Sequence, residues 1–167
     1  MAVSFANPIN QTGTMVGYGT WGNGLNFTAN PADGVRRAGK NTIDVVGTPA
    51  DNPANTGFTI QTDFDSPTGL GNSIGTNVPL ALEASTGGGD SGGPLVAGGN
   101  VVGVLNGGFP GTGGALSQYG DRSIWASLTD TANQNFLIGA GVVPVPEPAT
   151  AGLLALAGLA LAVRRRR

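Results

Sequence analysis

A serine surrounded by glycines lies near the middle of the chain, in the stretch Gly87-Gly-Gly-Asp-Ser-Gly-Gly-Pro-Leu-Val96. A serine hydroxyl becomes a nucleophile when a base takes its proton. Glycines on both sides let the backbone adopt positive φ values, which place the serine on a tight, exposed turn and aim neighbouring N–H groups at one point. We therefore predict that Ser91 is a nucleophile and that the N–H groups of Gly89 and Ser91 form an oxyanion hole.

A lone Gly-Ser-Gly in a chain with 30 glycines would indicate only a loop, but seven consecutive positions are specified here. Gly-Asp-Ser-Gly-Gly-Pro-Leu, residues 89–95, resembles the nucleophile motif of the chymotrypsin/trypsin-like serine proteases. Gly17-Tyr-Gly19, about seventy residues earlier, resembles the strand that opens the second of that family's two β-barrels. The resemblance implies that residues 1–141 form a single Greek-key-like barrel equivalent to this second barrel. It also implies an endopeptidase that acts through an acyl-enzyme at Ser91.

The resemblance assigns roles to other residues around Ser91. Asp90 has the place of a carboxylate that holds the loop and does not abstract a proton. Ser85, six residues before the nucleophile, has the place at the base of the primary specificity pocket, with Asn106, Gly107 and Gly108 along its wall. Because Ser85 is uncharged, we expect a preference for apolar side chains or a broad one. Asn106 stands where the family usually has a serine.

The chain has no histidine and no cysteine. The absence of cysteine excludes disulfides, thiolate chemistry and zinc–thiolate sites. In the resembled family a histidine, oriented by an aspartate, is the general base, and both come mainly from the first barrel. Without them an enzyme of this type keeps only about 10³- to 10⁴-fold acceleration over water. We therefore expect no useful peptidase activity from this chain alone; Lys40 is a conceivable substitute base, but nothing in the sequence positions it.

The first ten residues contain neither a basic region nor a long apolar run, so they do not predict a secretory signal peptide. We expect a missing N-terminal segment to carry both this signal and the histidine-bearing barrel, which would make the chain the C-terminal half of a protease. The alternative is a non-catalytic cell-surface or matrix protein built on a protease-derived barrel. Residues 1–163 hold four basic residues against ten acidic ones, a net charge of −6, which argues against nucleic-acid binding.

Composition indicates a turn-rich, all-β body, since glycine and proline make up 41 of the 167 residues and apolar β-branched runs lie between them. Residues 21–40 read as a polar loop or hairpin. In 57–64 the alternation places Phe58, Ile60 and Thr62 on one face. Asp63 and Asp65 could share a calcium ion, but calcium loops supply five or more oxygen ligands, so we expect no metal and no cofactor. Strands are predicted within 11–19, 41–46, 57–64, 94–96, 101–105 and 124–125, and a short helix over 129–138.

The composition changes after Gly141. Residues 142–148 form a proline-rich linker, residues 149–163 are fifteen residues without a charge, and the chain ends in Arg164, Arg165, Arg166 and Arg167. Physical chemistry alone predicts a short C-terminal transmembrane helix with its arginines on the cytoplasmic side. The triplet Pro146-Glu147-Pro148, the apolar segment and the arginines in 149–167 together resemble the PEP-CTERM sorting signal of Gram-negative bacteria. This implies transient residence in the inner membrane, removal of the tail by an exosortase, and delivery to the cell surface or extracellular matrix.

Overall fold

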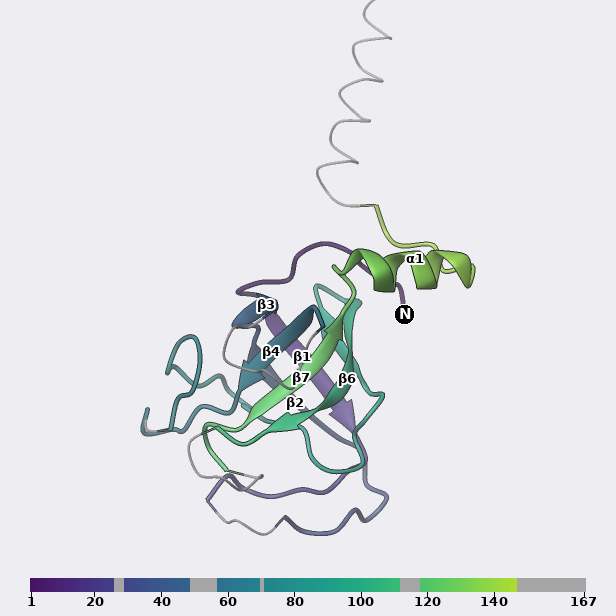
Figure 1. Ribbon diagram of the computed structural model, residues 1–167. Coiled ribbons are helices and arrows are strands. Elements are labelled where there is room, and N and C mark those ends of the chain that lie inside the picture. Colours follow the sequence, from purple (N-terminus) through teal and green to yellow (C-terminus); the bar gives the residue numbers. More distant parts are fainter. Residues whose placement is uncertain (26–28, 49–56, 70, 112–117, 147–167) are drawn as a thin grey trace, which may run out of the picture.

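The computed structural model describes residues 1–25, 29–48, 57–69, 71–111 and 118–146. Within these residues, seven strands form one antiparallel sheet and a single short helix follows them (Figure 1). The elements are β1 (Thr12–Gly17), β2 (Arg37–Thr42), β3 (Val45–Gly47), β4 (Thr59–Asp63), β5 (Pro94–Ala97), β6 (Asn100–Phe109), β7 (Arg122–Ser127) and α1 (Thr131–Gly139).

The sheet curls because its two edge strands are consecutive in the chain. The strand order is β2-β1-β5-β6-β7-β4-β3, and only Ile43 and Asp44 separate β2 from β3. The N–H of Ile43 donates to the carbonyl of Gln11 at 3.0 Å, beside β1, whereas the N–H of Asp44 donates to the carbonyl of Gln61 on β4 at 3.1 Å. One bent segment thus pairs with both ends of the sheet. The predicted all-β fold is confirmed at this level.

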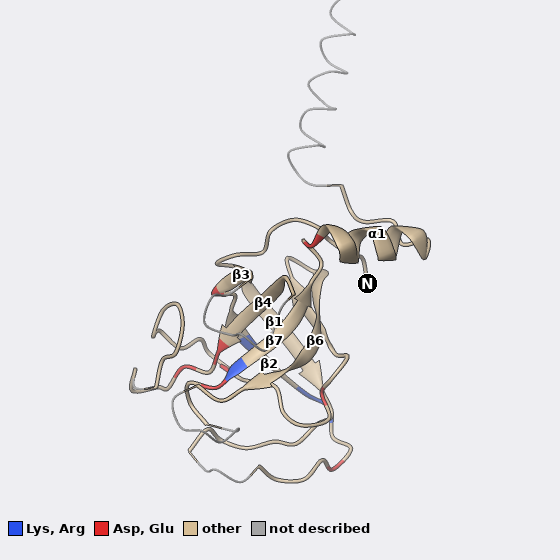
Figure 2. Cartoon of the chain, viewed as in Figure 1, with Lys and Arg blue, Asp and Glu red and all other residues tan. Residues whose placement is uncertain are grey.

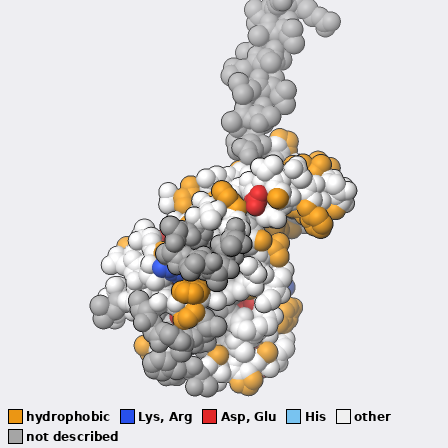
Figure 3. Space-filling view, in the orientation of Figure 1, with side chains coloured by type: hydrophobic (Ala, Val, Ile, Leu, Met, Phe, Trp, Pro, Cys, Tyr) orange, Lys and Arg blue, Asp and Glu red, His pale blue; other side chains and the backbone are white. Residues whose placement is uncertain are grey.

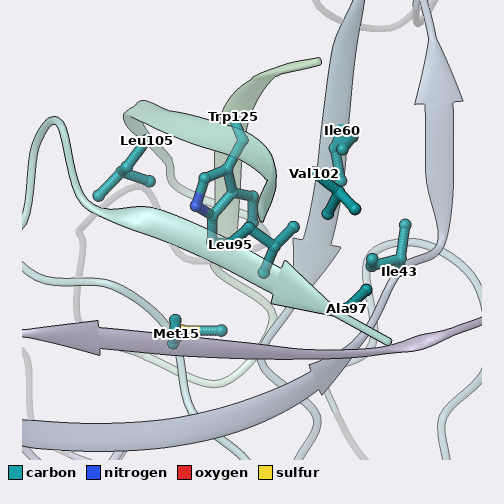
Figure 4. Packing of buried hydrophobic residues seen from close by; sticks show 8 residues of the cluster. All are labelled: Met15, Ile43, Ile60, Leu95, Ala97, Val102, Leu105 and Trp125. Atoms are coloured by element: carbon teal, nitrogen blue, oxygen red, sulfur yellow. The ribbon is translucent and has the colours of Figure 1, made fainter. Parts of the chain in front are cut away.

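Inside the curl, apolar side chains from five strands and from the bend at Ile43 point toward one another (Figure 4). Trp125 on β7 is fully buried and is the largest of them. Ile60 and Thr62 on β4 share a face, as the alternation predicts, yet Gln61 and Asp63 on the other face are buried as well. The buried cluster consists of Met15, Ile43, Ile60, Leu95, Ala97, Val102, Leu105 and Trp125.

Most of the predicted elements are present, but two expectations were wrong in part. Within the polar loop or hairpin predicted over 21–40, Trp21 pairs with Asn30 in an antiparallel bridge, but the end of this stretch belongs to β2, which pairs with β1 from Arg37 onward. Ala38 and Lys40 point outward, whereas Gly39 and Asn41 are buried, and Gly39 lies against Ala84 where a Cβ would collide. The strand predicted over 41–46 is interrupted by the bend, which divides it between β2 and β3. The strands near 11–19, 57–64, 94–96, 101–105 and 124–125 are confirmed.

The predicted terminal helix is α1, and both of its ends have a local cause. Asp130 caps the first turn by accepting a hydrogen bond from the N–H of Ala132 at 2.9 Å. At the other end Gly141 adopts φ of 85°, and the N–H of Val142 reaches the carbonyl of Leu137 at 2.9 Å, which turns the chain back. No helix among the described residues is long and apolar enough to cross a membrane. The transmembrane helix predicted over 149–163 lies outside those residues.

Candidate functional site

Ser91 lies exposed on a tight turn directly before β5. The turn contains Gly89 with φ of 99° and Gly92 with φ of 83°, values that a side chain rarely permits. Two backbone hydrogen bonds fix the turn to β6: the N–H of Gly92 donates to the carbonyl of Leu105 at 2.9 Å, and the N–H of Leu105 donates to the carbonyl of Gly93 at 2.8 Å. The hydroxyl is therefore presented to solvent from a backbone that is held in place.

Two N–H groups in this turn are available to an anion. Within the turn, the N–H of Asp90 is used by the carbonyl of Gly87 at 3.1 Å, and the N–H of Gly93 by the carbonyl of Asp90 at 2.9 Å. The N–H groups of Gly89 and Ser91 donate to no other group in the part of the chain that the structure describes. Stabilisation of an oxyanion requires backbone donors that are free of other acceptors, and these two are free.

The carboxylate of Asp90 joins this turn to the end of β1. One of its oxygens accepts a hydrogen bond from the N–H of Gly19 at 2.7 Å, and the other accepts one from the N–H of Gly87 at 2.8 Å. A Cβ at Gly17 or at Gly19 would collide with this carboxylate, so the Gly-Tyr-Gly stretch leaves the room that Asp90 occupies. Asp90 thus acts as an acceptor for two segments that are far apart in the sequence.

A cavity of about 220 Å³ lies beside residues 85–93, the loop that carries Ser91. Ser85, Gly87 and Asp90 line it from the loop, and Leu105 and Trp125 from the sheet. Its remaining walls include residues of β1 together with Trp21 and Arg37, whose guanidinium lies 4.5 Å from the indole ring centre. The cavity is mainly apolar, with polar groups from the loop and from Arg37.

The structure does not bring all the predicted site residues to this cavity. Ser85 lines it, whereas Ser91, Asn106 and Gly108 are not among its described walls. Asn106 and Gly108 are exposed on β6, where the pairing with β7 shifts between Leu105 and Gly107. Asn106 is the extra residue at this shift, a β-bulge of the kind common beside functional sites. The sequence offered no signal for the bulge beyond the neighbouring glycines.

A buried hydroxyl fixes the start of the loop. Ser123 on β7 is fully buried and accepts hydrogen bonds from the N–H of Thr86 at 3.0 Å and from the Thr86 hydroxyl at 2.9 Å. A hydroxyl oxygen has two lone pairs and one hydrogen. The hydrogen of Ser123 is therefore directed to the oxygen of Ser85, 3.0 Å away, which leaves the Ser85 O–H for a group outside the network.

A second cluster of polar groups lies beneath the segment that leads into the loop. Buried Asp63, at the end of β4, accepts hydrogen bonds from the N–H groups of Ser73 and Ile74 at 2.6 and 3.1 Å. Arg122 at the start of β7 donates to the carbonyl of Ser73 at 2.9 Å. Glu83 accepts from the N–H of Leu80 at 2.7 Å. Acidic positions gather around this end of β4 and β7 (Figure 2).

Burial and mutual repulsion alter the ionisation of these carboxyls. Burial, followed by the nearby charge of Asp63, raises the pKa of Asp44 to about 7, and burial likewise raises the pKa of Glu83 to about 7. Burial and the charge of Asp63 raise the pKa of Asp65 to about 6. Burial also raises the pKa of Asp63, against hydrogen bonds from Ser73 and Ile74 and the charge of Arg122 that lower it.

Only two members of this acidic cluster (Asp44, Asp63, Asp65 and Glu83) drew notice in the sequence, as a possible calcium pair. In the described part of the chain, no group of three or more acidic side chains is arranged to hold a metal ion. Asp44 and Glu83 were missed because both are far from β4 in the sequence. Asp44 lies in the bend between β2 and β3, and Glu83 lies in the segment that leads into the loop.

Comparison with protein-family models matches residues 144–167 to the PEP-CTERM protein-sorting motif. This span contains the predicted signal, from Pro146, Glu147 and Pro148 to Arg164–Arg167; of these, only Pro146 lies within the described residues. The motif implies recognition by an exosortase and indicates a protein that is anchored to the membrane and then delivered to the cell surface or exported. No curated protein matches the chain.

Proposed function

We propose that residues 1–141 are the second barrel of a trypsin-like serine endopeptidase and that Ser91 is its nucleophile. The observation that carries this proposal is the turn at residues 89–95. A seven-position motif places an exposed serine between two glycines of positive φ, with the N–H groups of Gly89 and Ser91 free. A loop that had only to connect two strands would not need this combination.

The strand order supports the same proposal. β1 pairs with β2 on one side and with β5 on the other, and the bent segment of β2 and β3 continues to β4. Counting this bent segment as one strand, the first four strands lie in the spatial order four, one, two, three, which defines a Greek key. This is the arrangement that resemblance to the second barrel requires.

In the proposed reaction, the oxygen of Ser91 bonds to the carbonyl carbon of a peptide, and the carbonyl oxygen takes the negative charge toward the N–H groups of Gly89 and Ser91. The serine proton has to pass to a base and then to the leaving amine. Asp90 is not that base, because both of its oxygens are occupied by backbone N–H groups. Lys40 is exposed on β2, and its side chain forms no hydrogen bond or ion pair with the described residues that would position it. The resembled family uses a histidine as this base, and the chain has none. In this proposal the base is therefore supplied from outside the chain, and the chain alone is inactive.

The proposed substrate is a peptide or protein segment. Ser85 lines a mainly apolar cavity and carries no charge, which favours an apolar or broad preference over a basic one. The O–H of Ser85 is free to donate to one acceptor atom, because Ser123 supplies the hydrogen between them. Asn106 and Gly108 can form part of the pocket wall only if substrate binding moves them to the cavity.

A second candidate is a non-catalytic surface or matrix protein built on the same barrel. The absence of histidine from the chain favours it, as does the separation of Ser91 from the cavity walls. In both cases the proposed route is the same: the tail holds the protein in the inner membrane, an exosortase removes it, and the body reaches the cell surface.

The two candidates differ in their reaction with a serine-directed phosphonate. The chain alone should remain unlabelled, while a version preceded by the residues encoded upstream of Met1 should be labelled at Ser91. Translation of that upstream DNA in all three frames should show a signal peptide, a histidine and an aspartate. Non-coding sequence there would remove the endopeptidase proposal and leave the surface protein.

A further inference from the structure

Apolar side chains are exposed around the last turn of α1 and the turn that follows it. Phe136 is 75% exposed, Ile138 54% and Val143 85%. No residue of α1 is buried, so the helix contributes little to the core of the curled sheet. Hydrophobic side chains gather over this end of the molecule (Figure 3). We call Phe136, Ile138 and Val143 the apolar tip.

The sorting motif begins beside the apolar tip and is fixed there. After the reversal at Gly141, the N–H of Val145 donates to the carbonyl of Val3 at 2.9 Å. Val3 in turn pairs with Val101 at the start of β6. The point from which the tail leaves is therefore held on the body, at the same end as α1 (Figure 1).

The length of chain between this point and the uncharged segment is short. Four residues lead from Val145 to Ala149, the first residue of the fifteen without a charge. At about 3.5 Å for each extended residue, Ala149 lies no more than about 14 Å from Val145. The headgroup layer of one leaflet is on the order of 5–8 Å thick. While the tail is in the bilayer, this short connection keeps Val145 near the membrane surface, where the apolar tip can reach the headgroup layer.

The charge distribution suits a contact with lipid chains and not with charged headgroups. Residues 131–146 contain no charged side chain, and the acidic Asp130 lies at the opposite end of α1 from the apolar tip. α1 is uncharged along its length apart from its start (Figure 2). A basic helix would be drawn to anionic lipids; this segment can gain only by burying apolar surface.

We infer that the apolar tip inserts into the outer face of the lipid bilayer while the tail is anchored, so that the body is seated on the membrane at the α1 end. The occupant of this surface is lipid acyl chain near the headgroup boundary. The inference rests on the sorting motif and its geometry, and it is independent of the proposed peptidase function. Release of the tail would remove the tether and leave only three apolar side chains to hold the body, which is weak attachment.

The chain has no cysteine, so single cysteines provide unique labelling sites. The full chain would be reconstituted in liposomes with an environment-sensitive fluorophore on Ile138→Cys or Val143→Cys. Val35→Cys is the matched control, because Val35 is 53% exposed and belongs to the segment between β1 and β2. Much of this segment lies at the opposite end of the body from α1 (Figure 1). Accessibility is then measured by quenching from brominated lipids and from iodide in the water.

The labels at positions 138 and 143 should shift to the blue, lose intensity with brominated lipids and resist iodide, whereas the label at 35 should do the reverse. The shift should be the same in zwitterionic and in anionic liposomes. Labels at 138 and 143 that behave like the control would overturn the inference. A blue shift without lipid quenching would overturn it too, since it would show that a second protein surface covers the tip.

Discussion

Replacement of Asp90 by asparagine tests how the loop that carries Ser91 is held. The carboxylate accepts hydrogen bonds from the N–H groups of Gly19 and Gly87 at 2.7 and 2.8 Å. The asparagine side chain would retain one oxygen acceptor but direct an NH₂ group at the other N–H, so that one bond is lost and two donors face each other. A hydrogen bond to a charged group contributes about 1.5–3 kcal/mol. We expect Asp90→Asn to lower the free energy of unfolding by about 2–3 kcal/mol.

Urea denaturation of the full chain, followed by tryptophan fluorescence, measures this loss. With a slope of about 1.5 kcal/mol per molar urea, the midpoint should fall by about 1.3–2 M. Asp33→Asn is the control: Asp33 forms an exposed ion pair with Arg37 at 2.8 Å, and its loss should leave the midpoint nearly unchanged. If Asp90→Asn unfolds at the same urea concentration as the unaltered chain, Asp90 does not brace the loop.

Three further predictions concern the polar groups around the loop. Because Asp44 and Glu83 have raised pKa values, the folded chain binds more protons than the unfolded chain between about pH 4 and 7. The urea midpoint should therefore fall as the pH rises from about 5 to about 8. After allowance for solvent screening, we expect the free energy of unfolding to fall by on the order of 1–2 kcal/mol, and a rising midpoint would contradict this. Ser123→Ala leaves the N–H of Thr86 without its acceptor and should cost about 1–3 kcal/mol by the same assay; a cost below about 0.5 kcal/mol would show that the hydroxyl network does not hold the loop. Ser91→Ala should change stability by less than about 0.5 kcal/mol, because Ser91 is exposed and its hydroxyl holds nothing in the described structure; a larger loss would assign Ser91 a structural role.

The turn around Ser91 could be predicted from the sequence because its cause is local. Glycine at 89 and 92 is needed for the positive φ values, and both positions stand close to the serine in the chain. The capped start of α1 at Asp130 is local in the same way. Where a conformation depends on residues next to one another, their types are enough to predict it.

The cavity and the acidic cluster could not be predicted in this way. The cavity is lined by Ser85 from the loop and by Trp125 from β7, which are far apart in the sequence. The cluster brings Asp44, in the bend between β2 and β3, close to Asp63 at the end of β4. The first part of β2 was missed for a related reason: residues 37–40 have no apolar alternation, and their pairing with β1 makes them a strand. These features depend on which strands become neighbours, and residue types alone do not give that.

The central claim is that Ser91 is a protease nucleophile without a base on its own chain. Mass spectrometry of Ser91 after treatment with a serine-directed phosphonate measures this directly, in the chain alone and in the chain extended by the residues encoded upstream of Met1. We predict no modification of the chain alone and full modification of an extended, histidine-containing protein. Modification of the chain alone, or an extended protein that carries the histidine and yet leaves Ser91 unmodified, would contradict the claim.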